Sequence, residues 1–468
     1  MLIIKTINLF FVLFLTLFFS CDDKNAENPA GSEDNNTDEI HFQPIDDLNI
    51  GLFTSSSECQ SCHPVHYEQW QNSSHHFSIN DPKFFSDWYE EQQARPESGT
   101  HFCSQCHIPV AFQIDSDLIN GFDNPLTYNS DSNIPDVLKE GIGCEFCHSM
   151  VEFPPKRIDT GSPPEPTVEF PLYPGQGYQF GSITNPVDNE YHKSEYLSIY
   201  EDSRMCASCH NHYINDKQIE TTFAEWESDP ANAMFNLNSC QSCHMQSSIG
   251  QAAVGGPDDR TIHNHNFVGV NTDLTQSYGS GDPIYDDVRD LLSESVEIEF
   301  EISNDESVEL VWSNNNLTIP ITITNLAAHN IPTGNAFVRE SWLELIVYDS
   351  EQNIIQSFGK VSDNEVLDVN ILPFYFTVEL LDENQDTIFT ASVAQDYHRT
   401  VLPTFGSVYD VIELDTEGWS QDIEDIIITA RMLFRSYKPI LLQSHPEMLE
   451  NLKIFEMDSI GTSLSISK

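Results

Sequence analysis

The chain has 468 residues, enough for two or three domains of ordinary size. It carries 20 Lys and Arg against 74 Asp and Glu, which gives a formal net charge of −54. Nucleic-acid binding without sequence preference and docking on an anionic lipid surface both need clustered cations, so this charge excludes both classes. With 39% hydrophobic and 11% aromatic residues, the composition is typical of a folded protein and not of an acidic disordered chain.

The first twenty residues have the pattern of an export signal. A single cation, Lys5, precedes an apolar run from Leu9 to Phe19 that is short for a membrane span and has the length of a signal-peptide core. Ser20 followed by Cys21 at the end of the run resembles a bacterial lipobox. We therefore predict a lipoprotein signal peptide over 1–20, cleaved before Cys21, whose sulfur carries the lipid. The alternative is an ordinary secretory signal with an incidental cysteine.

Residues 21–48 are predicted to form a disordered acidic tether. The segment is rich in Asp, Glu and Asn and too poor in apolar residues to bury a core. Acidic residues directly after Cys21 resemble the surface-export signals of some bacterial lipoproteins. We expect an exported outer-membrane lipoprotein, at the periplasmic face or the cell surface, that contacts the membrane only through the lipid on Cys21.

The ten remaining cysteines form five C-x-x-C pairs, and a histidine follows each pair directly. This pattern is the attachment signature of c-type haem, because two sulfurs three residues apart lie on one side of a helical turn and can bond the two haem vinyl groups. The adjacent imidazole then becomes the proximal ligand of the iron. We predict five covalently bound haems at Cys59, Cys62 and His63; Cys103, Cys106 and His107; Cys144, Cys147 and His148; Cys206, Cys209 and His210; and Cys240, Cys243 and His244.

Three other roles for the cysteine pairs explain the pattern less well. Structural zinc sites usually use two C-x-x-C pairs each, so five pairs leave one over, and zinc does not require a histidine after every pair. Disulfides suit an exported protein but give no reason for five histidines. Thioredoxin-like redox motifs need a βαβ context, which the surrounding sequence lacks.

The segment 49–290 is predicted to be a pentahaem cytochrome domain, mainly α-helical and irregular. It shows little helical periodicity and many Gly, Pro, Asn and Ser breaks, so the haems supply apolar filling that side chains supply elsewhere. Short helices are expected around the motifs, for example over Pro64–Gln71 and Ser203–His210. A faint internal repeat places an aromatic residue three positions ahead of both Trp70 and Trp226.

The stretch from 59 to about 270 resembles the multihaem cytochrome c family that includes cytochrome c-554 and hydroxylamine oxidoreductase. The resemblance covers about half of the chain and rests on CHPVHYEQWQNSSH, CSQCHIPVA, EGIGCEFCH, SRMCASCHN, CQSCHM and HNHNFVG. It implies multihaem binding without fixing one activity.

The resemblance also implies candidates for the distal iron ligands among the twelve remaining histidines. It implies His75 in W-x-x-S-x-H, His265 in H-x-F-x-G, and His329 in AHNIPTG, where Ala328 replaces the family's usual glycine. We add His192, which lies shortly before the fourth motif. The fifth distal ligand stays open between His212, which could reach a neighbouring haem, and His263, His66 or His76.

The segment 295–468 is predicted to be an all-β, immunoglobulin-like sandwich, so the chain as a whole is expected to be multidomain. Short alternating or β-branched runs such as NLTIPITITNL, SWLELIVYDS and DIIITARMLFRSY are separated by Asn, Asp, Gly and Pro. Pro439–Phe455 is expected to form a terminal helix. The region has no cysteine and carries no haem of its own, although it could lend His329 to one.

The sequence favours an electron-transfer cytochrome over an enzyme. Electrons would pass through the five haems between redox partner proteins and a periplasmic or extracellular acceptor, and the negative charge would favour cationic partners. The first alternative is an oxidoreductase of inorganic nitrogen or sulfur compounds that uses one five-coordinate haem. No motif is C-x-x-C-K, the variant at the active haem of pentahaem nitrite reductase. The second alternative is a surface adhesion protein in which the sandwich binds.

Overall fold

The protein is represented by a computed structural model that describes residues 42–81, 99–114, 133–154, 170–187, 189–214, 217–301, 316–420 and 422–465. Contacts group the chain from Phe42 onward into one compact unit. The predicted signal peptide, Cys21 and most of the predicted tether lie outside the described residues. The end of the tether, 42–48, belongs to the compact unit, since Phe42 packs against Tyr173 and Phe180.

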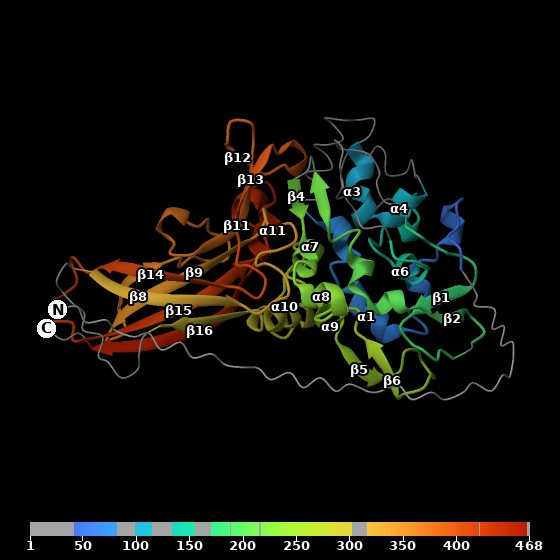
Figure 1. The fold of residues 1–468 in the computed structure, drawn as a ribbon, viewed down its shortest axis with the longest axis horizontal. Coiled ribbons are helices and arrows are strands. Elements are labelled where there is room, and N and C mark those ends of the chain that lie inside the picture. Colours follow the sequence, from blue (N-terminus) through green and yellow to red (C-terminus); the bar gives the residue numbers. More distant parts are fainter. Residues whose placement is uncertain are drawn as a thin grey trace, which may run out of the picture. The chain divides into compact units, whose positions relative to one another are not determined.

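Short helices and two-stranded sheets form the part of the chain that contains the C-x-x-C-H motifs (Figure 1). The helices are α1 (Pro64–Gln71), α3 (Gly99–His107), α4 (Pro109–Gln113), α6 (Cys144–His148), α7 (Thr222–Glu227), α8 (Pro230–Phe235) and α9 (Cys240–His244). The paired strands are β1 (Tyr178–Gly181) with β2 (Lys193–Tyr196), β3 (His212–Ile214) with β4 (Lys217–Glu220), and β5 (Ser247–Gly250) with β6 (Arg260–His263).

Proline explains where several of these helices begin. Pro64, Pro109 and Pro230 each occupy the first helical position, where the missing N–H would have no helical partner and the fixed φ favours the helix. The structure confirms the expected helix Pro64–Gln71 with the same bounds. The helix expected over Ser203–His210 is instead a 3-10 helix over Ser203–Cys206.

Antiparallel sheets dominate the chain after α10 (Pro283–Ser293), as the sequence predicted. A three-stranded sheet has the order β14-β8-β7, and a seven-stranded sheet has the order β12-β11-β9-β15-β16, with β10 paired to β9 and β13 to β11. The strands are β7 (Val296–Phe300), β8 (Asn316–Asn325), β9 (Glu340–Asp349), β10 (Ile354–Phe358), β11 (Tyr375–Leu381), β12 (Thr387–Ile388), β13 (Asp396–Thr400), β14 (Ser407–Asp415), β15 (Asp425–Arg435) and β16 (Ile454–Ser465).

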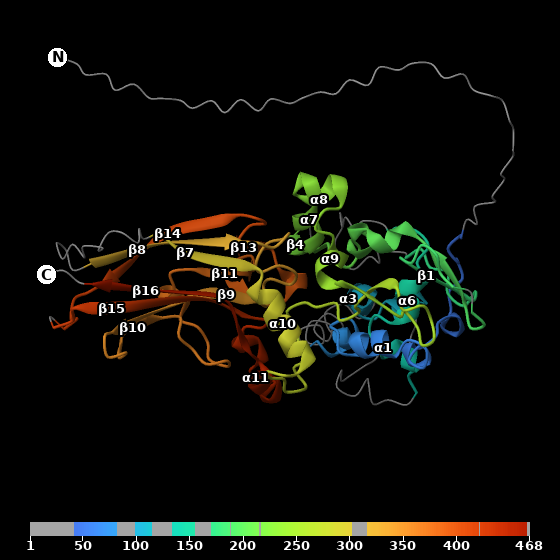
Figure 2. The same cartoon turned by 90° about the horizontal axis from the view of Figure 1, so that it is seen from below.

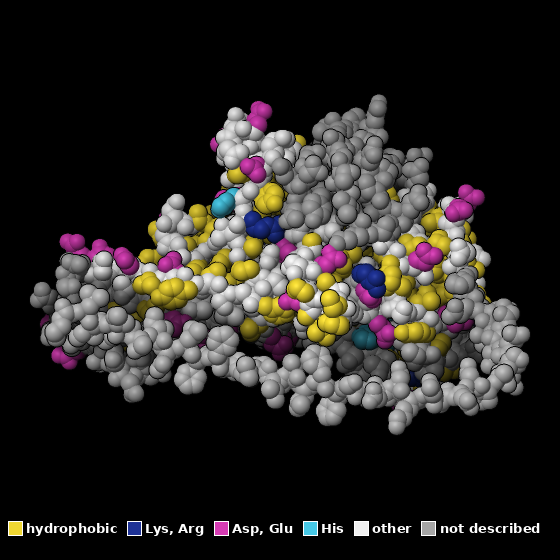
Figure 3. Space-filling view, viewed as in Figure 1, with side chains coloured by type: hydrophobic (Ala, Val, Ile, Leu, Met, Phe, Trp, Pro, Cys, Tyr) yellow, Lys and Arg dark blue, Asp and Glu magenta, His cyan; other side chains and the backbone are white. Residues whose placement is uncertain are grey.

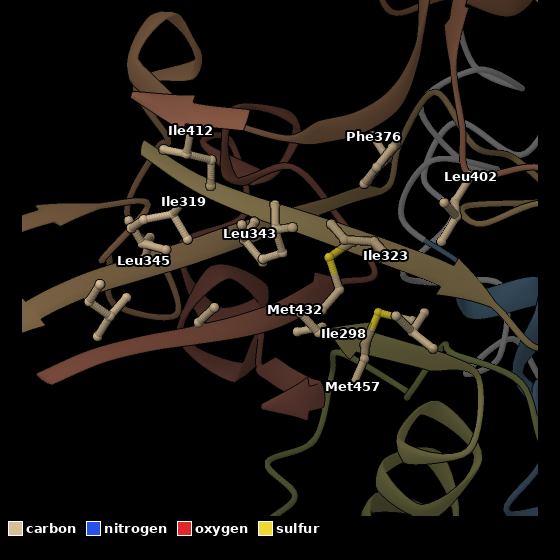
Figure 4. Close-up of a cluster of buried hydrophobic side chains, with 14 of the residues drawn as sticks. Ile298, Ile319, Ile323, Leu343, Leu345, Phe376, Leu402, Ile412, Met432 and Met457 are labelled. Atoms are coloured by element: carbon tan, nitrogen blue, oxygen red, sulfur yellow. The ribbon is translucent and has the colours of Figure 1, made fainter. Parts of the chain in front are cut away.

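One large core lies between these two sheets. Ile319 and Ile323 of β8 contribute to it from the smaller sheet, and Leu343, Leu345 and Met432 contribute from the larger one, as Figure 4 shows. The alternation along β8, with every second residue buried, is the pattern of a strand with one face toward a core. The two sheets therefore form a layered β region, and its classification as immunoglobulin-like stays a prediction.

Helix α10 joins the β core, although its chain position is at the end of the motif-bearing part. Val288 and Leu292 are buried in the core between the sheets, and Tyr285 lies with its ring centroid 5.0 Å from that of Phe455 in β16. Figure 2 shows α10 beside one end of the sheets. Among the described residues, no helix combines the length and apolar character needed to cross a bilayer.

The expected terminal helix over Pro439–Phe455 is wrong in its length. The segment contains a 3-10 helix over Pro439–Leu442 and α11 over Pro446–Asn451, and strand β16 begins at Ile454. Pro446 cannot continue a helix from the preceding turn because it lacks an N–H, so it starts a new one. β16 pairs with β15 over its whole length, and the sequence analysis did not predict this strand.

Candidate functional site: five C-x-x-C-H motifs and their histidines

Each motif occupies a short helical turn that brings its two cysteines to one side. The motifs of Cys103, Cys144 and Cys240 fall in α3, α6 and α9, and those of Cys59 and Cys206 follow 3-10 turns. In every motif the second cysteine follows the first by three residues, which is close to one helical turn. None of these ten described cysteines is in a disulfide.

The five motifs are not independent, because two pairs of them are built in the same way. The Cys59 side chain interacts with that of Cys144, and the Cys206 side chain interacts with that of Cys240. In the first pair, the N–H of Cys144 donates to Ser56 Oγ at 2.9 Å. In the second pair, the N–H of Cys240 donates to Ser203 Oγ at 3.0 Å.

Further contacts repeat between the two pairs. The Trp70 indole donates to the carbonyl two residues before Cys144 at 2.8 Å, and the Trp226 indole donates to the carbonyl two residues before Cys240 at 2.8 Å. Each tryptophan also packs against the aromatic residue three positions earlier, at a centroid separation of 5.5 Å. The faint sequence repeat at Trp70 and Trp226 thus corresponds to a repeated structural unit that joins two motifs.

Four of the proximal histidines lie opposite the four histidines predicted as distal ligands. The ring-centroid separations are 6.3 Å for His63 and His192, 6.4 Å for His210 and His75, 6.0 Å for His148 and His265, and 6.3 Å for His244 and His329. An iron bound to two imidazole nitrogens at about 2 Å each separates ring centroids by roughly 6 to 6.5 Å. The four pairs are therefore spaced to hold one haem iron each.

Hydrogen bonds at the far ring nitrogen orient most of these imidazoles. Nδ1 of His63 lies 2.7 Å from the Ala252 carbonyl oxygen, and the corresponding contacts are His107 to Ser78 at 2.8 Å, His148 to Phe180 at 2.6 Å, and His244 to Val268. A donor N–H at Nδ1 leaves the lone pair on Nε2, the form that binds a metal. On the distal side, Nδ1 of His265 and Nδ1 of His329 lie 3.0 Å from the carbonyl oxygens of His263 and Asn330.

Burial keeps these rings in the neutral form that a metal requires. Burial, assisted by the nearby His210, lowers the pKa of His75 to about 3. Burial likewise lowers the pKa of His244 to about 4, and that of His265 falls well below its ordinary value. Since protonated imidazole cannot coordinate a metal, the low pKa favours ligation at neutral pH.

His210 differs from the other proximal histidines. Its Nδ1 lies 3.7 Å from a carboxylate oxygen of Glu220. Burial alone would lower the pKa of His210, but the Glu220 carboxylate outweighs it and the pKa is raised. The sequence analysis did not single out Glu220, which has no motif around it.

The pair His63 and His66 shows why spacing alone is not sufficient. Their ring centroids are also 6.3 Å apart. However, His63 is the N-cap of α1 and His66 follows it by only three residues, so both rings come from one short stretch of chain. The ligand opposite His63 must come from another segment, and His192 meets that condition.

Two aromatic side chains lie against the histidines and were not predicted as site residues. The Phe267 ring lies between two predicted distal ligands, with its centroid 4.3 Å from that of His75 and 5.5 Å from that of His265. Tyr200 stacks on His148 at 5.8 Å, and its hydroxyl donates to the Cys147 carbonyl at 2.7 Å. Phe267 is part of the HNHNFVG sequence, which is the signal that could have indicated it.

The histidine opposite His107 is not assigned by these contacts. His212, the fifth distal candidate, lies at the start of β3 opposite Glu220 of β4. His263 donates from Nδ1 to the Met245 carbonyl oxygen at 2.9 Å, and the His76 ring packs on Trp70 with a centroid separation of 4.5 Å. His212 therefore stays a prediction.

His329 comes from the β region, and a buried carboxylate fixes the loop that carries it. Glu225 of α7 accepts hydrogen bonds from the backbone N–H of Asn330 at 3.2 Å and from the Thr333 hydroxyl at 2.6 Å. Arg399 of β13 donates to the same carboxylate at 2.8 Å. The AHNIPTG segment is thus tied to the motif-bearing part directly beside His329.

Comparison with known proteins agrees with this arrangement. Residues 58–149 match the model of the family described as cytochrome c554 and c-prime. The fold is similar to the crystal structure of a penta-heme cytochrome c552 from Thermochromatium tepidum, with a TM-score of 0.61 and 17% sequence identity. The similarity covers 88% of this chain and 99% of that one. No curated protein matches the chain by sequence.

Residues 58–149 are thus similar to a family of multihaem cytochromes c, and the fold is similar to that of a penta-heme cytochrome. The resemblance stated from the sequence is thereby confirmed at the level of the class.

Proposed function

We propose that the chain is a five-haem c-type cytochrome that transfers electrons. The observation that carries this proposal is the spacing of the four histidine pairs, 6.0 to 6.4 Å between ring centroids. A haem bound at each motif supplies a reversible one-electron iron couple. The proposed proximal ligands are His63, His107, His148, His210 and His244, and the proposed distal ligands are His192, His265, His75 and His329, with His212 a candidate opposite His107.

Filled axial positions favour electron transfer over catalysis. An iron held by two imidazoles needs little change in geometry between its oxidation states, and it offers no open position to a substrate. The chain's own residues support this role. Backbone carbonyls orient most of the proposed imidazole ligands, and burial keeps rings such as His244 and His265 neutral.

The contacts between motifs suggest how electrons would move. Cys59 with Cys144, and Cys206 with Cys240, would hold the attached haems of each pair close to one another. Phe267 connects the two pairs, because its ring touches His75, which faces His210, and His265, which faces His148. The proposed order therefore links the first and third haems to the fourth and fifth.

Charge favours a cationic partner or acceptor. The net charge is −54, and on the face shown in Figure 3 Lys and Arg appear at only a few places among scattered acidic groups. Such a surface would attract cationic redox proteins or metal ions more strongly at low ionic strength. We also propose that the β region is an immunoglobulin-like sandwich, that Cys21 carries a lipid, and that the protein is held at the outer membrane.

The decisive experiment counts the covalent haems of the holoprotein and determines the axial ligation of each iron. Mass measurement should show five covalent haems, and the ferric spectrum should be low-spin at the pairs proposed here. Replacing one distal ligand, as in His192→Ala or His329→Ala, should create one high-spin haem that binds carbon monoxide when reduced. The matched control is His398→Ala, since His398 lies on β13 among the strands.

Two results would overturn the proposal. Unmodified thiols in protein made with competent haem-attachment machinery would exclude c-type haem. Rapid binding of nitrite or hydroxylamine to the unmutated protein, followed by turnover, would instead favour the alternative of an oxidoreductase with one open iron.

A further inference from the structure

The five proximal histidines divide into two chemical groups by the partner at Nδ1. Four of them face a backbone carbonyl oxygen, as for His63 with Ala252 at 2.7 Å and His148 with Phe180 at 2.6 Å. At His210 the residue facing Nδ1 is a carboxylate, with Nδ1 3.7 Å from Glu220 Oε1. A carbonyl is a neutral dipole, whereas a carboxylate carries a full negative charge.

Glu220 is held firmly in this position. It is the last residue of β4, and its side chain is 12% exposed. Its Oε1 accepts from the Thr222 hydroxyl at 2.5 Å, and its Oε2 accepts from the Thr222 backbone N–H at 3.2 Å. Thr222 in turn contacts the Thr333 hydroxyl at 2.9 Å, so the carboxylate cannot easily turn away from His210.

Donors and a cation surround the carboxylate. Its oxygens accept from the hydroxyl and the backbone N–H of Thr222. The guanidinium of Arg339 also interacts electrostatically with Glu220, and it donates to the Thr333 carbonyl at 2.6 Å. Hydrogen-bond donors and a nearby cation favour the ionised form of a carboxylate.

We propose that Glu220 lowers the reduction potential of the haem iron held by His210, relative to the potential that a carbonyl partner would give. A carboxylate beyond Nδ1–H increases the electron density on the imidazole, and its charge stabilises ferric iron more than ferrous iron. Glu220 is a positioning residue, because it acts through His210. This inference rests on the proposed function, since it requires a haem at Cys206 and Cys209.

The test is a spectroelectrochemical titration of the full-length, haem-loaded protein. In Glu220→Gln, the reduction equilibrium of one haem in five should shift at least tenfold toward the ferrous form, which corresponds to about 59 mV for a one-electron couple. Glu220→Asp keeps a carboxylate and should shift the potential of the same haem less than Glu220→Gln does. Glu344→Gln is the matched control, since Glu344 is a buried carboxylate that pairs with Arg431 within the β region.

A second variant leaves the carboxylate in the chain and changes only how it is held. Thr222→Val removes the hydroxyl that holds Glu220 Oε1 beside His210, so the carboxylate is freer to turn away and the potential of the same haem should rise, by less than in Glu220→Gln. Electron paramagnetic resonance should show that all variants keep their low-spin signals, which a loss of His210 ligation would abolish.

Three results would overturn the inference. In both Glu220→Gln and Thr222→Val, the reduction equilibrium constants of all five haems could stay within threefold of their original values. Alternatively, Glu220→Gln could convert one haem to the high-spin form, which would show that Glu220 only holds the structure together. A mass without covalent haem would overturn this inference and the proposed function together, and the mass measurement separates that result from the other two.

Discussion

The loop that carries His329 should depend on Glu225, and Glu225→Ala tests this dependence. Glu225 is 8% exposed and Arg399 is 19% exposed, so the substitution leaves a largely buried guanidinium without its carboxylate. It also removes the acceptor for the Asn330 N–H and for the Thr333 hydroxyl. These losses are local to the contact between α7 and the β region.

The size of the effect follows from the burial of the pair. Removing one partner of a buried ion pair costs about 3 to 5 kcal/mol. Because Arg399 reaches solvent in part, we expect the lower end, about 3 kcal/mol, which is roughly a 150-fold change in an opening equilibrium. The loss should appear first as local opening of 328–334, since Glu225 is outside the core between the sheets.

Hydrogen–deuterium exchange of the full-length protein measures this opening directly, because the Asn330 N–H is itself a donor to Glu225. We expect that amide to exchange roughly 100-fold faster in Glu225→Ala. Glu344→Ala serves as the control, as it breaks the Glu344–Arg431 pair in β9 and β15 and should leave 328–334 protected. Exchange of Asn330 within threefold of the original rate, or equal opening in the control, would refute the reasoning.

Two further predictions concern the β region. Burial lowers the pKa of Lys438 to about 8, so the unfolded chain binds a proton that the folded chain lacks between about pH 8 and 10.5. The free energy of unfolding should therefore rise with pH across that window by about 3 kcal/mol from this group, and Lys438→Met should remove that part of the rise in denaturant titrations. Leu345→Ala should cost about 2 to 5 kcal/mol, because Leu345 is fully buried between the sheets, whereas Ile354→Ala, at a position 45% exposed, should cost less than about 1 kcal/mol. Equal losses in the two alanine variants, or an unchanged pH slope in Lys438→Met, would contradict these assignments.

Local patterns in the sequence were sufficient for the features that depend on neighbouring residues. The five C-x-x-C-H motifs require only one helical turn each, and helix α1 begins at Pro64 where the chain chemistry favours it. The alternation of β8 also predicts a strand with one buried face, which the structure confirms. The sequence analysis did not predict strand β16. Ile454–Ser465 mixes polar and apolar residues, and its strand conformation depends on pairing with β15.

Sequence motifs nominated His75, His265 and His329, but they could not state which motif each histidine faces. The facing pairs join residues that are distant along the chain, such as His244 and His329, so only the folded arrangement decides them. The same holds for Glu220, an ordinary acidic residue until the β3–β4 hairpin brings it to His210. The sequence by itself predicts the attachment chemistry, because that chemistry is local, whereas only the tertiary structure brings together the proposed opposing ligands and their electrostatic partners, because contacts between remote segments set them.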